Sequence, residues 1–160
     1  MSYLINTENI TNYAYNIDTN FTKEVISTSI EDFPGTEITY TPESGASKVI
    51  YECNLQIAWD PDAEGSYSCS RLQYSTDGGS SWTDIDGTKL MCGSHSANDD
   101  YAWFNYLWVF IIPAWTGERK IRLAGRAYTY NVEFTLGRSY NASDSEGVGS
   151  CPHTIIYSVK

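Results

Sequence analysis

A hydroxyl or thiol side chain stands beside a histidine at two places in the chain, Ser94-His95-Ser96 and Cys151-Pro152-His153. Such pairs are the raw material of nucleophilic catalysis. Adjacent residues of an extended chain point to opposite faces, however, so these pairs are poorly placed for proton transfer. The sequence also contains no Gly-x-Ser-x-Gly, HExxH or phosphate-loop motif. We therefore expect no catalytic residues and no enzymatic activity.

The acidic segment Asp60-Pro61-Asp62-Ala63-Glu64-Gly65 has the opening spacing of a calcium loop, with oxygens at alternate positions and glycine at the sixth. The twelfth position is Arg71 instead of glutamate, and no helix is expected on either side. We interpret the segment as an acidic surface loop and expect no bound metal.

The cysteines and histidines give no metal-finger spacing either. No two of the four cysteines form a CxxC pair. The first residues lack a basic region and a long apolar core, so we expect no secretory signal, synthesis in a reducing cytoplasm and free thiols. The cysteines are Cys53, Cys69, Cys92 and Cys151. No cofactor is expected.

Residues 75–82 match the Asp-box pattern Ser-x-Asp-x-Gly-x-x-Trp through Ser75, Asp77, Gly79 and Trp82. Asp77 can accept hydrogen bonds from turn amides, the glycines allow positive φ, and Trp82 can pack under the hairpin. The motif is best known from sialidase-like propellers, where it recurs. Because it occurs once here, we expect it to stabilise a turn.

Five of the ten basic residues lie between Arg119 and Arg138. Lys120, Arg122 and Arg126 share one face of an expected strand. They could form an attachment surface for an acidic protein or glycan. Alternatively, they could form a solvated face paired with Glu52 or Glu133 across strands.

The stretch 103–112, Trp-Phe-Asn-Tyr-Leu-Trp-Val-Phe-Ile-Ile, is apolar or aromatic on both phases of a two-residue period. A strand that covers only its own core needs one such face. We therefore expect a second copy of the protein to cover the other face. The alternative is a central strand buried on both sides within one chain. The run is too short for a membrane helix, which needs about 20 residues. The expected subunit interface is Phe104, Tyr106, Trp108, Phe110 and Ile112.

The rest of the chain after Pro34-Gly35 has a β pattern, with one core face expected on residues 49–59. That face consists of Val49, Tyr51, Cys53, Leu55, Ile57 and Trp59. A final strand, 154–159, is expected to direct Ile155, Tyr157 and Val159 to the core. Eight or more short strands and no long helix predict an all-β sandwich or jelly roll, in which the first and last strands can pair.

Residues 1–34 differ from residues 35–160, which we expect to form the jelly-roll domain. The first stretch is rich in Asn, Thr, Tyr and Ile without a clear period. Lys23–Phe33 could form a turn or two of helix. We expect an N-terminal arm that packs on a partner, and the alternative is a poorly ordered tail.

The net charge of −10 excludes nucleic acid and anionic membranes as partners. If the protein sits near packaged DNA, the same charge places it outside the enclosing shell.

The segment from about Ile38 to Lys160 resembles the C1q/TNF-like jelly rolls found in virion proteins of marine bacteriophages, particularly those of cyanobacteria. The resemblance rests on residues 38–42 (Ile-Thr-Tyr-Thr-Pro), 47–52, 72–82, 121–126 and 155–159. It implies a sandwich assembled as a homotrimer, with aromatic strands packed about the threefold axis. The chain departs from the pattern in having no collagen-like repeat or coiled-coil stalk before the domain.

The resemblance and the charge together lead us to expect a bacteriophage structural protein on the virion exterior, most simply a trimeric capsid decoration or cement protein. Its arm would contact the major capsid protein or another virion protein. The first alternative is a knob of a tail or head fibre that binds a receptor or host glycan, with exposed aromatics beside the loops 94–101 and 141–150. A glycan hydrolase is the remote alternative, and it would need two carboxylates about 5–10 Å apart in a cleft.

Overall fold

The computed structural model describes residues 10–17, 24–26, 28–59, 66–94, 102–127, 134–136 and 152–160. Every regular element among these residues is a β-strand. The strands are β1 (Ile10–Ile17), β2 (Glu24–Ile26), β3 (Glu31–Asp32), β4 (Ile38–Tyr40), β5 (Lys48–Trp59), β6 (Ser66–Ser75), β7 (Thr83–Asp84), β8 (Leu90–Ser94), β9 (Ala102–Pro113), β10 (Arg119–Ala127), β11 (Phe134–Leu136) and β12 (His153–Val159).

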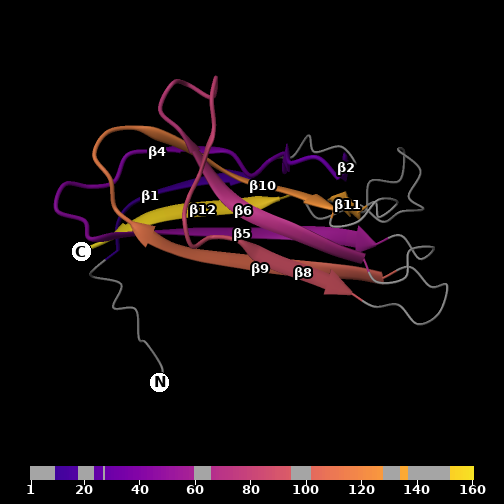
Figure 1. Ribbon diagram of the computed structural model, residues 1–160. Helices are drawn as coiled ribbons and strands as arrows, with labels where there is room; N and C mark the ends of the chain where they lie inside the picture. Colours follow the sequence, from indigo (N-terminus) through magenta and orange to yellow (C-terminus); the bar gives the residue numbers. More distant parts are fainter. Residues whose placement is uncertain are drawn as a thin grey trace.

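Two antiparallel sheets form a sandwich (Figure 1). In the first, which we call the β5 sheet, β1, β12, β5 and β9 lie side by side. β11 pairs with the last residues of β5, and β2 pairs with β11. In the second, the β10 sheet, β3 and β4 pair with β10, β10 with β6, and β6 with β7 and β8. The chain passes from one sheet to the other between β4 and β5, β5 and β6, and β9 and β10. This strand order is that of a jelly roll, so the predicted fold class is confirmed.

The core lies between the sheets and is built from one phase of each long strand. From β5 it receives Val49, Tyr51, Cys53 and Leu55, which are fully buried, as the alternation of the sequence predicts. Ile121 and Leu123 enter it from β10. Tyr51 is satisfied inside the core, because its hydroxyl donates a hydrogen bond to the carbonyl of Thr36 over 2.7 Å. Burial raises the pKa of this hydroxyl well above its usual value.

The boundary predicted after residue 34 does not coincide with a boundary of the sandwich. β1 pairs with β12 from Ile10↔Val159 to Ile17↔His153, and β3 pairs with β10. The last strand therefore pairs with a strand of the stretch expected to be an arm, and not with β4, the first strand of the expected domain, which pairs with β10. Residues 1–9 lie outside the described residues.

The helix considered for Lys23–Phe33 is replaced by β2 and β3. Phe33 fixes this segment, because its side chain is buried in the core and its amide donates to the carbonyl of Leu123 over 2.9 Å. Gly125 makes room for the ring, since a Cβ there would lie 2.6 Å from Phe33 Cζ and 2.7 Å from the Cys69 carbonyl. The β-branched residues that weakened the helix prediction fit a strand better.

Candidate functional site

β9 turns its aromatic phase toward the core. Trp108, Phe110 and Ile112 are buried within the single chain, and Tyr106 packs against the same core while half-buried. The side chain of Phe104 lies outside the described residues. The prediction that this phase forms a subunit interface is therefore corrected: the opposite sheet covers these side chains in one chain.

The aliphatic phase of β9 faces outward. Leu107, Val109 and Ile111 are 64%, 48% and 63% exposed. Among the described strands β9 pairs with β5 alone, and paired residues of the two strands lie on the same side of the sheet. Leu107, Val109 and Ile111 pair with the residues of β5 that alternate with its core residues, so they lie on the outer side of the β5 sheet. An uncovered apolar surface therefore exists on β9, but on the phase opposite to the one predicted.

β12 shows the same reversal. Thr154, Ile156 and Ser158 face the core and are fully buried, whereas Ile155 is 42% exposed on the outer face. Tyr157 shares this outer phase and is covered by its neighbours there. The expected core phase of Ile155, Tyr157 and Val159 is thus the outer phase.

The strand register places these outward side chains in three rows across β1, β12, β5 and β9. The first row is Tyr13, Tyr157, Ile50 and Ile111. The second is Tyr15, Ile155, Glu52 and Val109. The third is Ile17, His153, Asn54 and Leu107. We call these three rows the apolar outer face.

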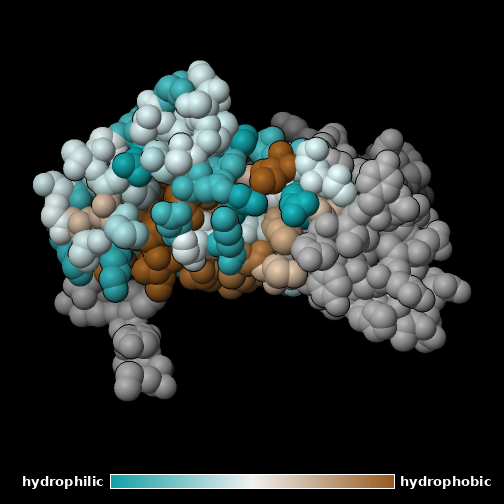
Figure 2. Space-filling view, viewed as in Figure 1, coloured by the Kyte–Doolittle hydropathy of each residue, from teal (hydrophilic) through white to brown (hydrophobic). Residues whose placement is uncertain are grey.

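Tyr13 and Tyr15 are among the most exposed large side chains of the described residues, at 70% and 67%. Figure 2 shows hydrophobic side chains gathered along the lower edge of the sandwich, where Figure 1 places β9. Patches of this kind on a small protein mark interaction sites. The sequence signal for β1 was the alternation of Tyr13, Tyr15 and Ile17, which was missed because the surrounding residues lack a period.

The outer side of the β10 sheet has the opposite character. Arg122 donates from Nε and Nη2 to the side-chain oxygen of Gln73, Oε1, over 3.1 and 3.0 Å. The side-chain nitrogen of Gln73, Nε2, donates to the Asp84 carboxylate over 3.0 Å. Asp84 also pairs with Arg71. We call Arg71, Gln73, Asp84, Lys120 and Arg122 the polar outer face.

The acidic partners of this face differ from those considered in the sequence. Lys120 pairs with Glu37 at 2.6 Å, and Arg122 lies 3.7 Å from Asp32. Glu52 belongs to the other sheet, and Glu133 lies outside the described residues. Burial lowers the pKa of Arg122, although Asp32 opposes this effect. Since Lys120 and Arg122 have carboxylates of the same chain, they do not require an external acidic partner.

The Asp-box residues meet in one turn between β6 and β7. The Asp77 carboxylate accepts hydrogen bonds from the Ser81 hydroxyl over 2.6 Å, from the Ser75 hydroxyl over 2.7 Å and from the Ser81 amide over 3.0 Å. The hydrogen bonds from Ser81 and Ser75 lower the pKa of Asp77. Gly78 and Gly79 have φ of 75° and 100°.

Trp82, the last residue of the box, returns over the β10 sheet. The guanidinium of Arg122 lies 3.9 Å from the centre of its ring, a cation–π contact. The turn thereby covers part of the polar outer face. This geometry assigns the motif a stabilising role and gives it no catalytic group.

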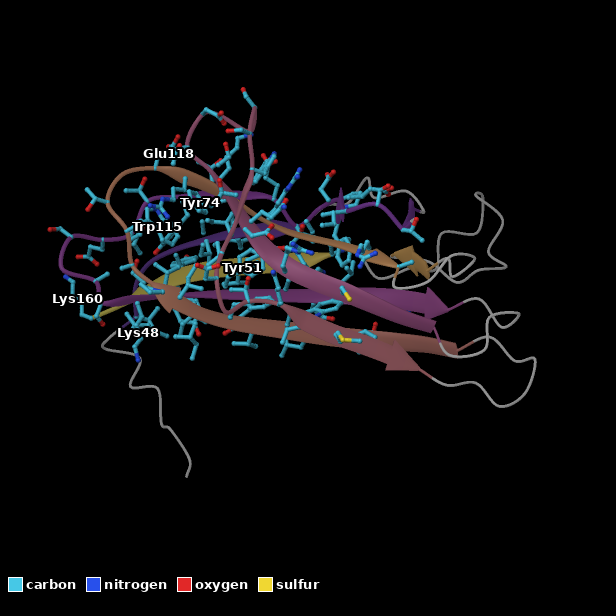
Figure 3. All side chains as sticks on the ribbon, in the orientation of Figure 1. Lys48, Tyr51, Tyr74, Trp115, Glu118 and Lys160 are labelled. Carbon is cyan, nitrogen blue, oxygen red and sulfur yellow. The ribbon has the colours of Figure 1, made fainter. Side chains whose placement is uncertain are left out.

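A surface hollow of about 370 Å³ lies at one end of the sandwich, near Tyr74 and Trp115, which Figure 3 labels. Arg119 occupies the aromatic surface there, since its guanidinium lies 4.5 Å from the centre of the Tyr74 ring and 5.3 Å from that of Trp115. Of the carboxylates in its lining, Asp84 is held by Arg71 and Gln73. The hollow therefore offers no free aromatic stacking platform, and Asp84, one of the two carboxylates in its lining, is already held within the chain.

Several predicted features lie beyond the described residues: the loop 60–65, the loop 141–150, and most of the loop 94–101. Within the described part, no cluster of three or more His, Cys, Asp or Glu could hold a metal ion. Nor does that part contain a helix of the length and hydrophobicity that a membrane crossing requires. Cys53 is a buried free thiol whose pKa burial raises to about 12, and Cys69 is also free.

Comparisons with known proteins complete this description. No protein-family model and no curated protein sequence matches the chain. Among solved structures, the chain is similar to the Eiger TNF from S. frugiperda, with 9% sequence identity and a TM-score of 0.39 over 91% of this chain and 92% of that chain. At this identity the likeness concerns the arrangement of strands alone.

Proposed function

We propose that the protein is a non-enzymatic structural protein that assembles into a homotrimer through the apolar outer face. The observation that carries the proposal is the exposure of Leu107, Val109 and Ile111 on the same face of one sheet as Tyr13 and Tyr15. Removing apolar surface from water stabilises an assembly by about 25 cal/mol per Å². A face of this composition is therefore expected to be covered in the working protein.

The number of subunits comes from the resemblance of residues 38–160 to C1q/TNF-like jelly rolls of bacteriophage virions. The same resemblance supports a place on the exterior of a virion, as a decoration or cement protein on the capsid. Arms of one trimer that touch neighbouring shell subunits would add avidity and brace the shell against the pressure of the packaged DNA. Since β1 and β3 belong to the sandwich, we assign the contact with the major capsid protein to residues 1–9.

Assembly is tested by measuring the mass in solution, by light scattering and sedimentation, over a wide concentration range. We expect three times the mass of one chain. Ile111→Asp places a charge on the apolar outer face and should yield a folded monomer with unchanged circular dichroism. Thr39→Asp is the matched control, because Thr39 is exposed on β4 in the other sheet. A wild-type protein that is monomeric throughout would overturn the proposal.

The place on the virion is tested separately by the copy number in purified particles. Many copies per particle support capsid decoration, whereas few copies support a fibre knob. Deleting residues 1–9 leaves β1 intact and should abolish binding to shells while the trimer persists. Retained shell binding would show that these residues are not the anchor.

A further inference from the structure

Glu52 is the only acidic residue among the three rows of the apolar outer face. It lies on β5 in the middle row, between Ile155 on β12 and Val109 on β9. The side chain is half-buried in the single chain. The Tyr157 hydroxyl donates a hydrogen bond to its carboxylate over 2.8 Å. A carboxylate therefore stands at the centre of the surface that the proposed trimer would cover.

The lysine and arginine cations available to Glu52 within its own chain are few and distant. On β5, Lys48 lies four residues away, about 13 Å along an extended strand. Figure 3 places Lys48 near the same end of the sandwich as Lys160, which pairs with Glu43 at 2.8 Å.

The remaining ionisable groups of the face lie on β12 and β1. His153 on β12 is in the adjacent row, opposite Asn54, and is exposed. Tyr13 and Tyr15 face outward on β1, while the outward residues of β9 between Asn105 and Pro113 are uncharged. Within the described part of the chain, Glu52 forms no ion pair.

Tyr157 is a hydrogen-bond donor and carries no charge. Burial, together with the adjacent Glu52 carboxylate, raises the pKa of Tyr157 to about 12, so the hydroxyl keeps its proton at ordinary pH. One neutral donor satisfies part of the carboxylate, but it does not replace the water that assembly would remove.

We infer that assembly through the apolar outer face is linked to proton uptake by Glu52, so that the trimer is most stable at low pH and loosens as the pH rises. This inference rests on the proposed trimer. A carboxylate that loses its water and has no cation beside it favours its neutral form. The neutral carboxyl keeps the hydrogen bond from Tyr157 through its remaining acceptor oxygen.

The sign follows from linkage. The assembled state binds protons more tightly at Glu52 than the separate subunits do, so association is favoured wherever protons are available and weakens with rising pH. Each proton taken up changes the association constant by up to about tenfold per pH unit. Three copies of Glu52 per trimer can therefore give a steep dependence.

The test measures the monomer–trimer equilibrium by sedimentation between about pH 5 and about pH 8, where such a linkage operates. We expect wild type to dissociate progressively as the pH rises. Glu52→Gln should assemble more tightly than wild type at the high end, with a much flatter pH dependence. Glu118→Gln makes the same change of charge at an exposed turn on the other side of the sandwich and should behave as wild type (Figure 3).

His153→Gln removes the imidazole of the apolar outer face, and this variant should keep the wild-type pH dependence of assembly. A trimer whose pH dependence survives Glu52→Gln would overturn the inference but leave the proposed function standing. So would assembly that tightens as the pH rises, because a neighbour's Lys48 would then supply the counter-charge. A protein that stays monomeric at every pH would overturn the proposed function itself, and this inference with it.

Discussion

The two outer faces of this sandwich differ in the polarity of their side chains and in how far the chain itself covers them. On the β10 sheet, Arg122 is held by Gln73, by Asp32 and by the ring of Trp82. On the β5 sheet, Leu107 and Ile111 meet water with no cover. Both sheets contribute equally well-packed phases to one core, so the difference arises only from the outward residues. The polar residues of one face have their partners within the chain, whereas the apolar residues of the other are exposed.

The contrast also separates two kinds of stabilisation. Ion pairs and cation–π contacts at a surface contribute little each, and they set the shape of a turn or sheet more than its stability. Apolar surface contributes in proportion to the area removed from water. Most of the stabilising free energy is therefore expected from burial in the core and, in the assembled protein, from burial of the apolar outer face.

The largest expected effect comes from comparing neighbours on β9. Phe110→Ala should cost about 3–5 kcal/mol of the free energy of unfolding of the single chain, because a buried ring leaves a cavity. Val109→Ala, one residue away, should change the unfolding of a dilute monomer by less than about 1 kcal/mol and weaken assembly instead. Denaturant titration at low concentration measures the first effect, and sedimentation the second. Equal losses of the free energy of unfolding in the dilute monomer would contradict the assignment of Phe110 to the core and Val109 to the outer face.

A smaller effect is expected from the centre of the polar outer face. Partial burial opposes the charge of Asp84, but hydrogen bonds from Gln73 and Arg71 together outweigh it and lower the pKa of the carboxyl. A depressed folded pKa means stability that is present above about pH 4, the ordinary range of the unfolded carboxyl, and that is lost as the pH falls through the folded value.

Asp84→Asn should therefore cost about 1 kcal/mol at neutral pH, discounted for the partial exposure of the pair. The difference from wild type should shrink in acid, as seen by thermal unfolding at a series of pH values. A constant difference at every pH would contradict this assignment. Assembly should be unchanged, because the residue lies on the polar outer face.

The smallest effect concerns the cover of that face. Replacing Trp82 with leucine removes the ring over Arg122 and should cost about 0.5–1 kcal/mol. Trp82→Phe keeps a ring and should lose less. Thermal unfolding of both variants makes the comparison, and identical losses would show that packing alone, not the cation–π contact, explains the position.

The sequence predicted the phase of β5 correctly because its alternate residues differ clearly in polarity. Val49, Tyr51 and Cys53 alternate with the polar Glu52 and Asn54, and only one arrangement buries the apolar set. An apolar terminal strand needs neighbours, but the sequence did not identify β1 as the partner of β12, because β1 lies in the stretch expected to be an arm.

The phase of β9 could not be predicted, because both of its sides are apolar. On β12 the polarity indicated the wrong phase, because Thr154 and Ser158 are buried toward the core and make hydrogen bonds there with Cys53 and Tyr40. Alternation decides a face only when one side is polar. Aromatic size favoured the wrong side on β9, and Ile155 and Tyr157 favoured it on β12. Both corrections point to one physical fact: β9 and β12 carry apolar side chains on the outside of the β5 sheet.

β1 was missed for a different reason. Its inner residues, Ala14 and Asn16, are small or polar, and Asn16 bonds to the carbonyls of Gly35 and Glu37 over 3.3 and 3.2 Å. A strand whose inward side chains bind a loop carries no inward hydrophobic signal. The local register shift near Asn12, where φ is 49°, disturbs the pattern further.

The pairing of Ile10 with Val159 places both ends of the folded chain at one pole of the barrel-like body. A peptide bridge of a few glycines and serines could join them, which makes the molecule a natural candidate for circular permutation. New ends could then be opened in an exposed turn, such as the one at Gly78. A tag joined before Ile10 and one joined after Val159 would emerge side by side, next to the first of the hydrophobic rows that neighbouring copies are proposed to share.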